Sequence, residues 1–441
     1  MMKKIIILLL LPLAVAAQKN YPALLNDYAE AEFKVKDFNG TVLVMQKGKE
    51  IYKKAFGMAD REWNVPNTVD TKFRIGSVTK QFTAACILQL AEHGKLSTDD
   101  KLTKYIPEYP KGDSITIHML LNHTSGITNY TNLPEFWPKA VLPLSIDSMI
   151  ALFKNKPFDF SPGSKWNYSN SGYFLLGVIV EKASGKKFNE YLNENITTKL
   201  GLKNTSLDRL DSVLAFRAQG YDKNQQGVWS HAMYISMEAP YSAGAMVSTV
   251  DDLYKWTKAL HNNQVLSAAS TKKMITPYMN NYGYGIGIDS LKSHQRISHN
   301  GGIPGFVTNL SYYPADDVCV VVVSNNGSNS DGVSSALASI LFDLPVQKPY
   351  IPKEVKIDTT LLDKYVGKYI ATNPIEIIKK DGKLYRHRDG SDDVELKPES
   401  DTRFFYADDS DRFIEFEVDK TGKVIKGWFI GSGNKTEMKK Q

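Results

Sequence analysis

The segment that most constrains the fold is residues 73–90, where Ser77 and Lys80 precede a long apolar stretch. It reads Phe73-Arg74-Ile75-Gly76-Ser77-Val78-Thr79-Lys80-Gln81-Phe82-Thr83-Ala84-Ala85-Cys86-Ile87-Leu88-Gln89-Leu90. Residues three apart on a helix are neighbours on one side, so the Ser77 hydroxyl and the Lys80 amine can meet. The helix start favours a forming alkoxide, and burial lowers the pKa of a lysine. The segment therefore predicts a buried helix that begins with a nucleophile beside its base.

The bare Ser-x-x-Lys spacing is common and needs support from the rest of the chain. It recurs at Ser184/Lys187, Ser270/Lys273 and Ser432/Lys435. Two of these copies lie in polar turns that contain glycine and the third at a polar helix start, whereas Ser77 alone opens a long apolar helix. Without further support, Ser77 would be a helix cap and Lys80 a solvated side chain.

The N-terminus has the pattern of an export signal. Residues 3–4 are basic, residues 5–13 are apolar, and residues 14–17 are small. The apolar stretch is too short to cross a bilayer as a helix. We predict a signal peptide over residues 1–17, a mature protein beginning near Ala17 or Gln18, and a periplasmic or secreted location. The alternative is a short membrane-bound anchor.

The composition narrows the class of function. Of the 441 residues, 42% are hydrophobic and 23% charged, as in ordinary soluble proteins, and the length allows two or three domains. The formal net charge is only +6 and no dense basic stretch occurs, which argues against a nucleic-acid partner. Cys86 and Cys319 lie in apolar stretches, so we expect core residues rather than a disulfide or a metal site.

The order of the predicted elements indicates an α+β domain followed by a small all-β domain. A helix near residues 21–34 and a hairpin over 40–57 precede the helix that contains Lys80. Residues 95–235 look helical and form a separate subdomain, and four strands near 284–288, 296–299, 308–313 and 318–324 precede a last helix over 331–342. We expect an antiparallel sheet with the first and last helices on one face and an all-helical subdomain beside it. We predict that this first domain covers residues 18–344.

The C-terminal part alternates in a way that is typical of a barrel. A Pro-rich linker over residues 345–355 separates it from the first domain. Beyond the linker, short β-rich stretches alternate with turns near residues 380–383 and 419–423. We therefore predict a closed or half-closed β-barrel over residues 356–441.

A second candidate segment surrounds Tyr168 and Asn170. Tyr-x-Asn also occurs at Tyr130, Tyr191 and Tyr278. This copy differs because a Pro-Gly turn and a tryptophan precede it and an apolar helix follows it. A tyrosine near a lysine can relay a proton, and an asparagine can hold a substrate amide or the lysine.

A third candidate segment is His299-Asn300-Gly301-Gly302, which ends a predicted strand. The two glycines leave room for close backbone approach, and a strand-edge N–H there could complete an oxyanion hole with the N–H of Ser77. At its ordinary pKa of about 6.5, His299 is mostly neutral at pH 7 and gains charge as the pH falls toward 6. We expect it to donate one hydrogen bond to a substrate.

Two further segments are predicted to be structural. His123, in His123-Thr124-Ser125-Gly126, is expected to bond a tight loop rather than to catalyse. Residues 241–253 are expected to be architectural, with Ser248 or Thr249 capping a helix.

These motifs, in this order, resemble those of the serine β-lactamase and penicillin-binding-protein superfamily, in its branch of class C β-lactamases, D-alanyl-D-alanine carboxypeptidases and esterases. The resemblance covers roughly residues 24–343. The C-terminal part, beginning at Leu362-Asp363-Lys364-Tyr365-Val366-Gly367-Lys368-Tyr369, resembles the lipocalin-like domains appended to many such hydrolases.

The resemblance implies the site residues and their roles. Ser77 would be the acylated nucleophile, Lys80 its base partner, and Tyr168 the group that transfers protons to the leaving group and from water. Asn170, His299, Asn300 and Gly301 would bind substrate, and the backbone N–H groups of Ser77 and Gly302 would form the oxyanion hole. No metal and no organic cofactor are expected.

One departure bears on the substrate. The third motif of this branch's β-lactamases is Lys-Thr-Gly, whereas this chain has His299-Asn300-Gly301, as in the family's esterases and D-amino-acid peptidases. A literal Lys420-Thr421-Gly422 falls in a predicted hairpin turn of the barrel, and we interpret it as coincidence. The scissile bond therefore stays open between an ester, a D-amino-acid amide or peptide, and a β-lactam. The substrate would be a small molecule or derived from peptidoglycan, and the alternative is a penicillin sensor or a binding protein without turnover.

Overall fold

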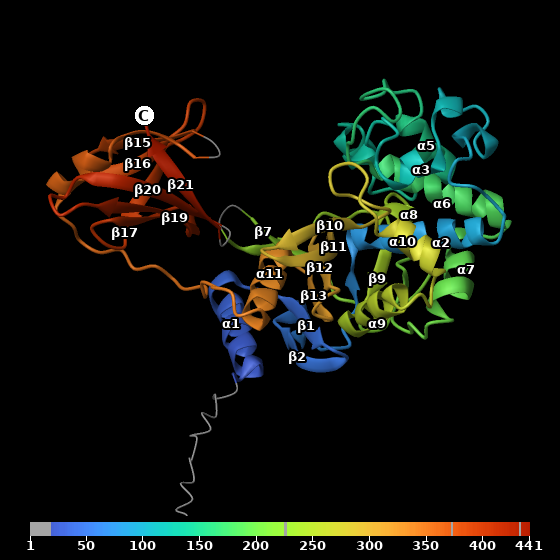
Figure 1. The fold of residues 1–441 in the computed structure, drawn as a ribbon, viewed down its shortest axis with the longest axis horizontal. Helices are drawn as coiled ribbons and strands as arrows, with labels where there is room; N and C mark the ends of the chain where they lie inside the picture. Colours follow the sequence, from blue (N-terminus) through green and yellow to red (C-terminus); the bar gives the residue numbers. More distant parts are fainter. Residues whose placement is uncertain (1–18, 225–226, 372–373, 432–433) are drawn as a thin grey trace, which may run out of the picture.

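The computed structural model describes residues 19–441 except 225–226, 372–373 and 432–433. The signal peptide predicted at residues 1–17 lies outside the described residues. A mixed α/β domain precedes a separate C-terminal barrel, and an extended linker connects them (Figure 1). None of the helices described is both long enough and apolar enough to span a bilayer.

The first domain is built on a six-stranded antiparallel sheet with the order β10-β11-β12-β13-β1-β2. Its strands are β1 (Gly40–Gln46), β2 (Lys49–Phe56), β10 (Gly287–Leu291), β11 (His294–Ile303), β12 (Phe306–Tyr313) and β13 (Val318–Ser324). The turn between β1 and β2 uses Lys47 and Gly48 with φ of 50° and 77°. The predicted strand over 284–288 begins only at Gly287, because Gly285 has a φ of 69° and turns the chain.

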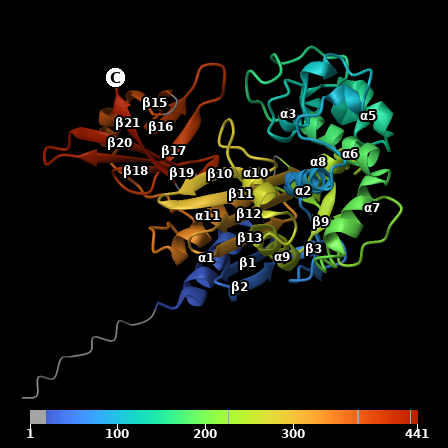
Figure 2. The ribbon, with the colours of Figure 1, turned by 45° about the vertical axis from the view of Figure 1, so that its right-hand side comes forward.

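Helices cover both faces of this sheet, which explains why β13 is buried at every position. Val320 and Val322 face α1 (Tyr21–Lys36) and α11 (Ser330–Leu341), while Val321 and Val323 face the larger core. The prediction that the first and last helices share one face is confirmed, and Figures 1 and 2 show them side by side.

The helix that contains Lys80 lies in the larger core. A short 3₁₀ turn, η1 (Gly76–Val78), leads into α2 (Thr79–Glu92), which is buried from Thr79 to Leu90 as predicted. The ring of Phe82 stacks on Trp256 of α9 (Val250–His261) with centroids 4.0 Å apart. Both cysteines are buried and unpaired.

A helical subdomain packs against α2 (Figure 2). It contains α3 (Ile117–Leu121), α4 (Phe136–Lys139), α5 (Ile146–Phe153), α6 (Asn170–Ser184), α7 (Phe188–Leu192), α8 (Tyr241–Gly244) and α10 (Ala268–Met274), with the short helices η2 (Leu102–Lys104), η3 (Gly112–Ser114), η4 (Tyr130–Asn132) and η5 (Asn193–Thr197). The prediction that residues 95–235 are purely helical was incomplete, because β6 (Ser206–Leu207), β7 (Tyr221–Lys223) and β8 (Trp229–His231) lie there. Strand β9 (Met246–Ser248) pairs with β5 (Phe73–Arg74) and β6, and β3 (Met58–Asp60) pairs with β4 (Val65–Pro66). Strands this short follow no visible period in the sequence.

The C-terminal part is a closed eight-stranded barrel. Its strands are β14 (Gly367–Ile370), β15 (Pro374–Lys380), β16 (Lys383–His387), β17 (Val394–Pro398), β18 (Arg403–Tyr406), β19 (Asp409–Val418), β20 (Val424–Gly431) and β21 (Asn434–Lys440). Buried aromatic and aliphatic side chains form its core, together with two residues of the 3₁₀ helix η6 (Thr359–Tyr365). The Lys420-Thr421-Gly422 sequence forms the β19–β20 turn, where the Asp419 carboxylate accepts the N–H groups of Thr421 and Lys423.

Candidate active site

Ser77 and Lys80 meet where η1 passes into α2. The Lys80 Nζ lies 2.9 Å from the Ser77 Oγ. The serine is partly exposed, whereas the lysine is fully buried. The geometry thus presents a reachable hydroxyl beside an amine that is shielded from water.

The surroundings of Lys80 favour a neutral amine with a defined orientation. Its Nζ also lies 2.8 Å from the Asn170 Oδ1 and 2.8 Å from the Ala243 carbonyl oxygen, and both atoms can only accept. A neutral amine has two N–H donors and one lone pair. The two acceptors can take both N–H groups and leave the lone pair facing Ser77. Burial lowers the pKa of Lys80 well below its usual value.

Tyr168 and Asn170 reach the same point from the start of α6. The Ser169 side chain caps that helix, so the chain turns sharply between Tyr168 and the first helical residue, Asn170. The Tyr168 side chain lies close enough to the Ser77 side chain for Ser77 to influence the phenol. The Lys80 Nζ lies 4.9 Å from the centroid of the Tyr168 ring. Desolvation raises the pKa of Tyr168, with a smaller opposing effect of Ser77, which keeps the phenol protonated at neutral pH.

The two glycines of β11 pack directly against the η1 turn. A Cβ on Gly301 would lie 1.9 Å from the Ile75 carbonyl oxygen and 3.3 Å from the Ser77 nitrogen. A Cβ on Gly76, which has a φ of 49°, would lie 2.7 Å from the Gly302 nitrogen. Only glycines permit this approach, which brings Gly302 of β11 next to the η1 turn that contains Ser77.

His299 lies at the site with both ring nitrogens already bonded. Its Nδ1 lies 2.6 Å from the Asn300 carbonyl oxygen, which can only accept, so Nδ1 carries the proton. Its Nε2 therefore accepts from the Tyr282 hydroxyl at 2.7 Å. The one N–H of the ring is thus occupied in this arrangement, and the expected hydrogen bond from His299 to a substrate stays a prediction. Burial, with a smaller contribution from Lys80, lowers the pKa of His299 to about 3.

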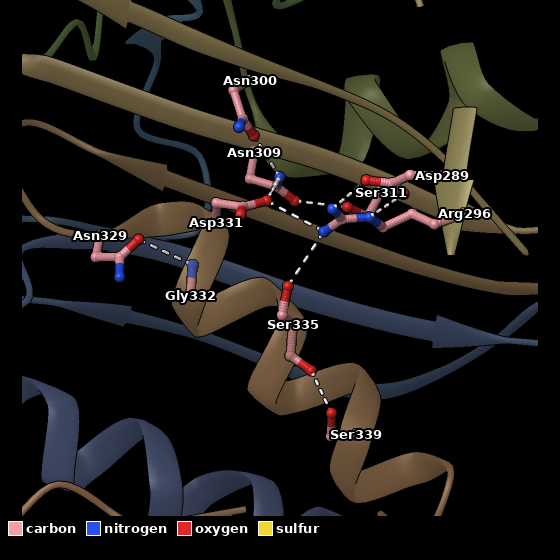
Figure 3. Close-up of polar contacts among 10 residues, drawn as sticks. All are labelled: Asp289, Arg296, Asn300, Asn309, Ser311, Asn329, Asp331, Gly332, Ser335 and Ser339. Atoms are coloured by element: carbon pink, nitrogen blue, oxygen red, sulfur yellow. Dashed lines mark hydrogen bonds and ion pairs between the residues drawn. The ribbon is translucent and has the colours of Figure 1, made fainter. Parts of the chain in front are cut away.

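The Asn300 side chain lies on the opposite face of β11 from His299, as strand alternation requires. Its Oδ1 accepts from the Asn309 Nδ2 at 2.6 Å, and the same Nδ2 lies 2.8 Å from the Asp331 carboxylate of α11. Asp331 is also 3.1 Å from Arg296. Figure 3 shows this polar network between the sheet and α11. The structure thus places the amide of Asn300 in a bracing network, and its substrate contact stays a prediction.

Two of the other Ser-x-x-Lys copies and the Tyr-x-Asn copy at Tyr278 lack such surroundings. The lysines of two Ser-x-x-Lys copies have other partners: Lys187 pairs with Glu181, and Lys273 donates to Thr98. Ser432 lies outside the described residues. Among the other Tyr-x-Asn tyrosines, Tyr278 is 55% exposed and pairs edge-on with His118.

Two groups at the site carry no signal in the sequence. The Ala243 carbonyl belongs to the 241–253 segment, which was predicted to be architectural. Thr249 does cap α9 there, but a backbone acceptor leaves no signal in a sequence. Tyr282 was also missed, since one tyrosine among 23 carries no mark of its contact with His299.

Comparison with known proteins agrees with this geometry. A family model described as Beta-lactamase matches residues 31–341. The chain belongs to this family. Penicillin-binding protein 4* of Bacillus subtilis (strain 168) is 30% identical to it over 417 residues, which cover 87% of this chain and 90% of that protein. The match covers about 384 residues of this chain, which is more than the first 344 residues can supply. It therefore extends beyond the first domain.

Two further members of the family illustrate its range. The teichoic acid D-alanine hydrolase of Staphylococcus aureus (strain MRSA252) is 27% identical over 323 residues, covering 72% of this chain and 77% of that protein. The crystal structure of a penicillin binding protein from Bacillus halodurans superposes with a TM-score of 0.65 and 29% identity, over 71% of this chain and 98% of that chain. The Beta-lactamase domain and these relatives identify this protein as a serine hydrolase with the penicillin-binding-protein fold.

Proposed function

We propose that the protein is an exported acyl hydrolase that cleaves esters or amides of D-amino acids through an acyl-enzyme on Ser77. The observation that carries the proposal is the environment of Lys80: two neutral acceptors hold its amine with the lone pair toward Ser77. The name of the D-alanine hydrolase relative supports the D-aminoacyl group. Export rests on the signal-peptide pattern of residues 1–17.

Acylation follows from the contacts at the site. The Lys80 amine takes the proton of the Ser77 hydroxyl as Oγ attacks the substrate carbonyl carbon. The N–H groups of Ser77 and Gly302 stabilise the negative charge on the carbonyl oxygen. The protonated Tyr168 gives its proton to the leaving oxygen or nitrogen as the bond to the acyl carbon breaks. The Lys80 ammonium then returns a proton to the Tyr168 oxygen, which leaves the amine neutral and the phenol protonated again.

Deacylation uses the same groups in reverse. Tyr168 takes a proton from the incoming water while it passes its own proton to the neutral Lys80 amine, and the hydroxide formed attacks the acyl carbon. Ser77 Oγ leaves and is reprotonated, which restores the resting site. Asn170 holds the amine in place throughout, because its Oδ1 bonds Lys80 and its Nδ2 donates to the Thr131 hydroxyl at 3.3 Å.

The third motif disfavours substrates that carry a carboxylate next to the reacting bond. A lysine there would offer a permanent cation, whereas His299 is neutral and has no free N–H. A charge-assisted hydrogen bond is roughly twice as strong as a neutral one. With a pKa of about 3, His299 stays neutral at pH 6, so the expected gain on anionic substrates near pH 6 is withdrawn.

The test is a substrate panel with one matched variant. Purified protein would be assayed with p-nitrophenyl acetate, the p-nitroanilides of D-alanine and L-alanine, and nitrocefin. We expect turnover of the ester and of the D-anilide over the L-anilide, and a shift of kcat/KM toward nitrocefin in His299→Lys. Nitrocefin turnover far above that of every ester and anilide would contradict the proposal, and labelling by a fluorescent penicillin without any turnover would favour the sensor.

A further inference from the structure

His123 contacts the backbone on both sides of Tyr168. Its carbonyl oxygen accepts the N–H of Asn167 at 3.0 Å, and its ring Nδ1 accepts the N–H of Ser169 at 3.2 Å. Its ring also packs on the Tyr168 ring, with centroids 4.3 Å apart and planes at 42°. One residue therefore bonds the N–H groups of both residues next to Tyr168 and packs on the Tyr168 ring.

The backbone of His123 adopts a conformation that residues other than glycine rarely take. Its φ is 63°, in the left-handed region, and the residue is only 1% exposed. Such conformations persist where the surrounding structure over-determines them, and they cluster at functional sites. Here the carbonyl and the ring of one residue both reach the 167–169 segment.

The ring of His123 also touches the partner of His299. Its centroid lies 4.8 Å from that of Tyr282, whose hydroxyl donates to His299. Because Nδ1 accepts from Ser169, the proton of the neutral ring sits on Nε2, which has no hydrogen-bond partner among the described residues. Burial, with smaller contributions from Lys80 and His299, lowers the pKa of His123. The titratable side chains whose rings face it are Tyr168, Tyr173 and Tyr282. The ring thus acts as a neutral spacer between two tyrosines of the site.

We propose that His123 is a positioning residue that sets the Tyr168 hydroxyl against Ser77 through its two acceptors. This inference rests on the proton-transfer role proposed above for Tyr168. Proton transfer demands hydrogen-bond distance, and a displacement of about 1 Å can cost on the order of a hundredfold in rate. Loss of the Nδ1 acceptor frees the Ser169 peptide group and lets Tyr168 move away from Ser77.

Two substitutions distinguish the effect of the Nδ1 acceptor from the effect of the ring. His123→Asn keeps an acceptor on Cγ, tolerates a left-handed φ and removes the ring. His123→Phe keeps a ring and removes the acceptor. His118→Phe is the matched control, because His118 lies in α3 and bonds Tyr284 and Asn122 rather than the 167–169 segment. Circular dichroism checks folding, and His123→Gly replaces the Phe variant if that variant does not fold, since glycine adopts the left-handed φ and also lacks the acceptor.

The readout is the rate on two substrates with different need of a proton on the leaving group. The nitrophenolate of p-nitrophenyl acetate leaves readily, whereas the anilide nitrogen of D-alanine p-nitroanilide needs protonation. We expect His123→Phe to lower kcat on the anilide by about 10- to 100-fold, with acylation by the ester and both KM values within about threefold. His123→Asn and His118→Phe should stay within about threefold on both substrates. Equal losses in the acylation rates on ester and anilide, or a loss in His123→Asn equal to that in His123→Phe, would overturn the proposal.

A double variant separates failure of this inference from failure of the proposed function. If His123 acts through Tyr168, then His123→Phe/Tyr168→Phe should be no slower on the anilide than Tyr168→Phe alone. Losses that multiply would refute the positioning role and leave the role of Tyr168 standing. Wild-type anilide turnover in Tyr168→Phe would instead refute the proposed role of Tyr168.

Discussion

Replacing Gly301 by alanine tests whether the contact between β11 and the η1 turn builds the oxyanion hole. The new Cβ would lie 1.9 Å from the Ile75 carbonyl oxygen, and an ordinary carbon–oxygen contact needs about 3 to 3.5 Å. Strand and turn must therefore separate by roughly 1 to 1.5 Å, which takes an N–H···O bond of about 2.9 Å beyond hydrogen-bond range. Loss of one oxyanion donor costs about 10²- to 10³-fold in kcat, or about 2.7–4 kcal/mol.

The matched control is the next residue. A Cβ on Gly302 meets nothing within 4 Å, and Gly302 keeps its N–H when it becomes alanine. Steady-state kinetics on p-nitrophenyl acetate should show Gly302→Ala within about tenfold of wild type and Gly301→Ala at least a hundredfold slower in kcat, with circular dichroism confirming that both fold. A folded Gly301→Ala variant with wild-type kcat, or equal losses in both variants, would refute this account of the hole.

Three further perturbations test the base, the buried histidine and the linker. Lys80→Met and Tyr168→Phe should each lower kcat/KM on the anilide by about 10²- to 10⁴-fold, and a loss below tenfold in either would remove that residue from proton transfer. His299 has a pKa of about 3 when folded and about 6.5 when unfolded, so its contribution to stability is complete above pH 6.5 and is lost as the pH falls below it. Between pH 6.5 and 5 this amounts to about 2 kcal/mol in urea unfolding, and an equal pH dependence in His299→Gln would contradict the assignment. Truncation after Lys348 should leave a soluble, active first domain, because among the described residues the core of the barrel has no member in common with the cores of the first domain. An insoluble product in a solubility assay would show that the barrel completes the first domain.

The sequence predicted those parts of the fold and site that depend on regular periodicity or on short spacing. The contact of Ser77 with Lys80 follows from helix geometry over three residues, and the burial of α2 follows from its unbroken apolar stretch. The β1–β2 hairpin and the alternation of the barrel strands likewise show a local pattern. Each of these features is decided by neighbours in the chain.

The remaining features are decided by contacts between distant segments. The Ala243 carbonyl, the Tyr282 hydroxyl and the bracing of Asn300 by Asn309 involve backbone atoms or common polar residues with no period of their own. His123 is the clearest example of a contact that the sequence could not predict. The sequence suggested a histidine bonded to a tight loop, but only the structure shows that it bonds both neighbours of Tyr168.

The most direct measurement of the central claim is the mass of the acyl-enzyme. Wild-type protein treated with a fluorophosphonate, or quenched during turnover of p-nitrophenyl acetate, should gain one adduct, and peptide mapping should place that adduct on Ser77. Ser77→Ala should remain folded and gain no mass. An adduct on Ser77→Ala, or a wild-type adduct mapped to another residue, would contradict the assignment of Ser77 as the nucleophile.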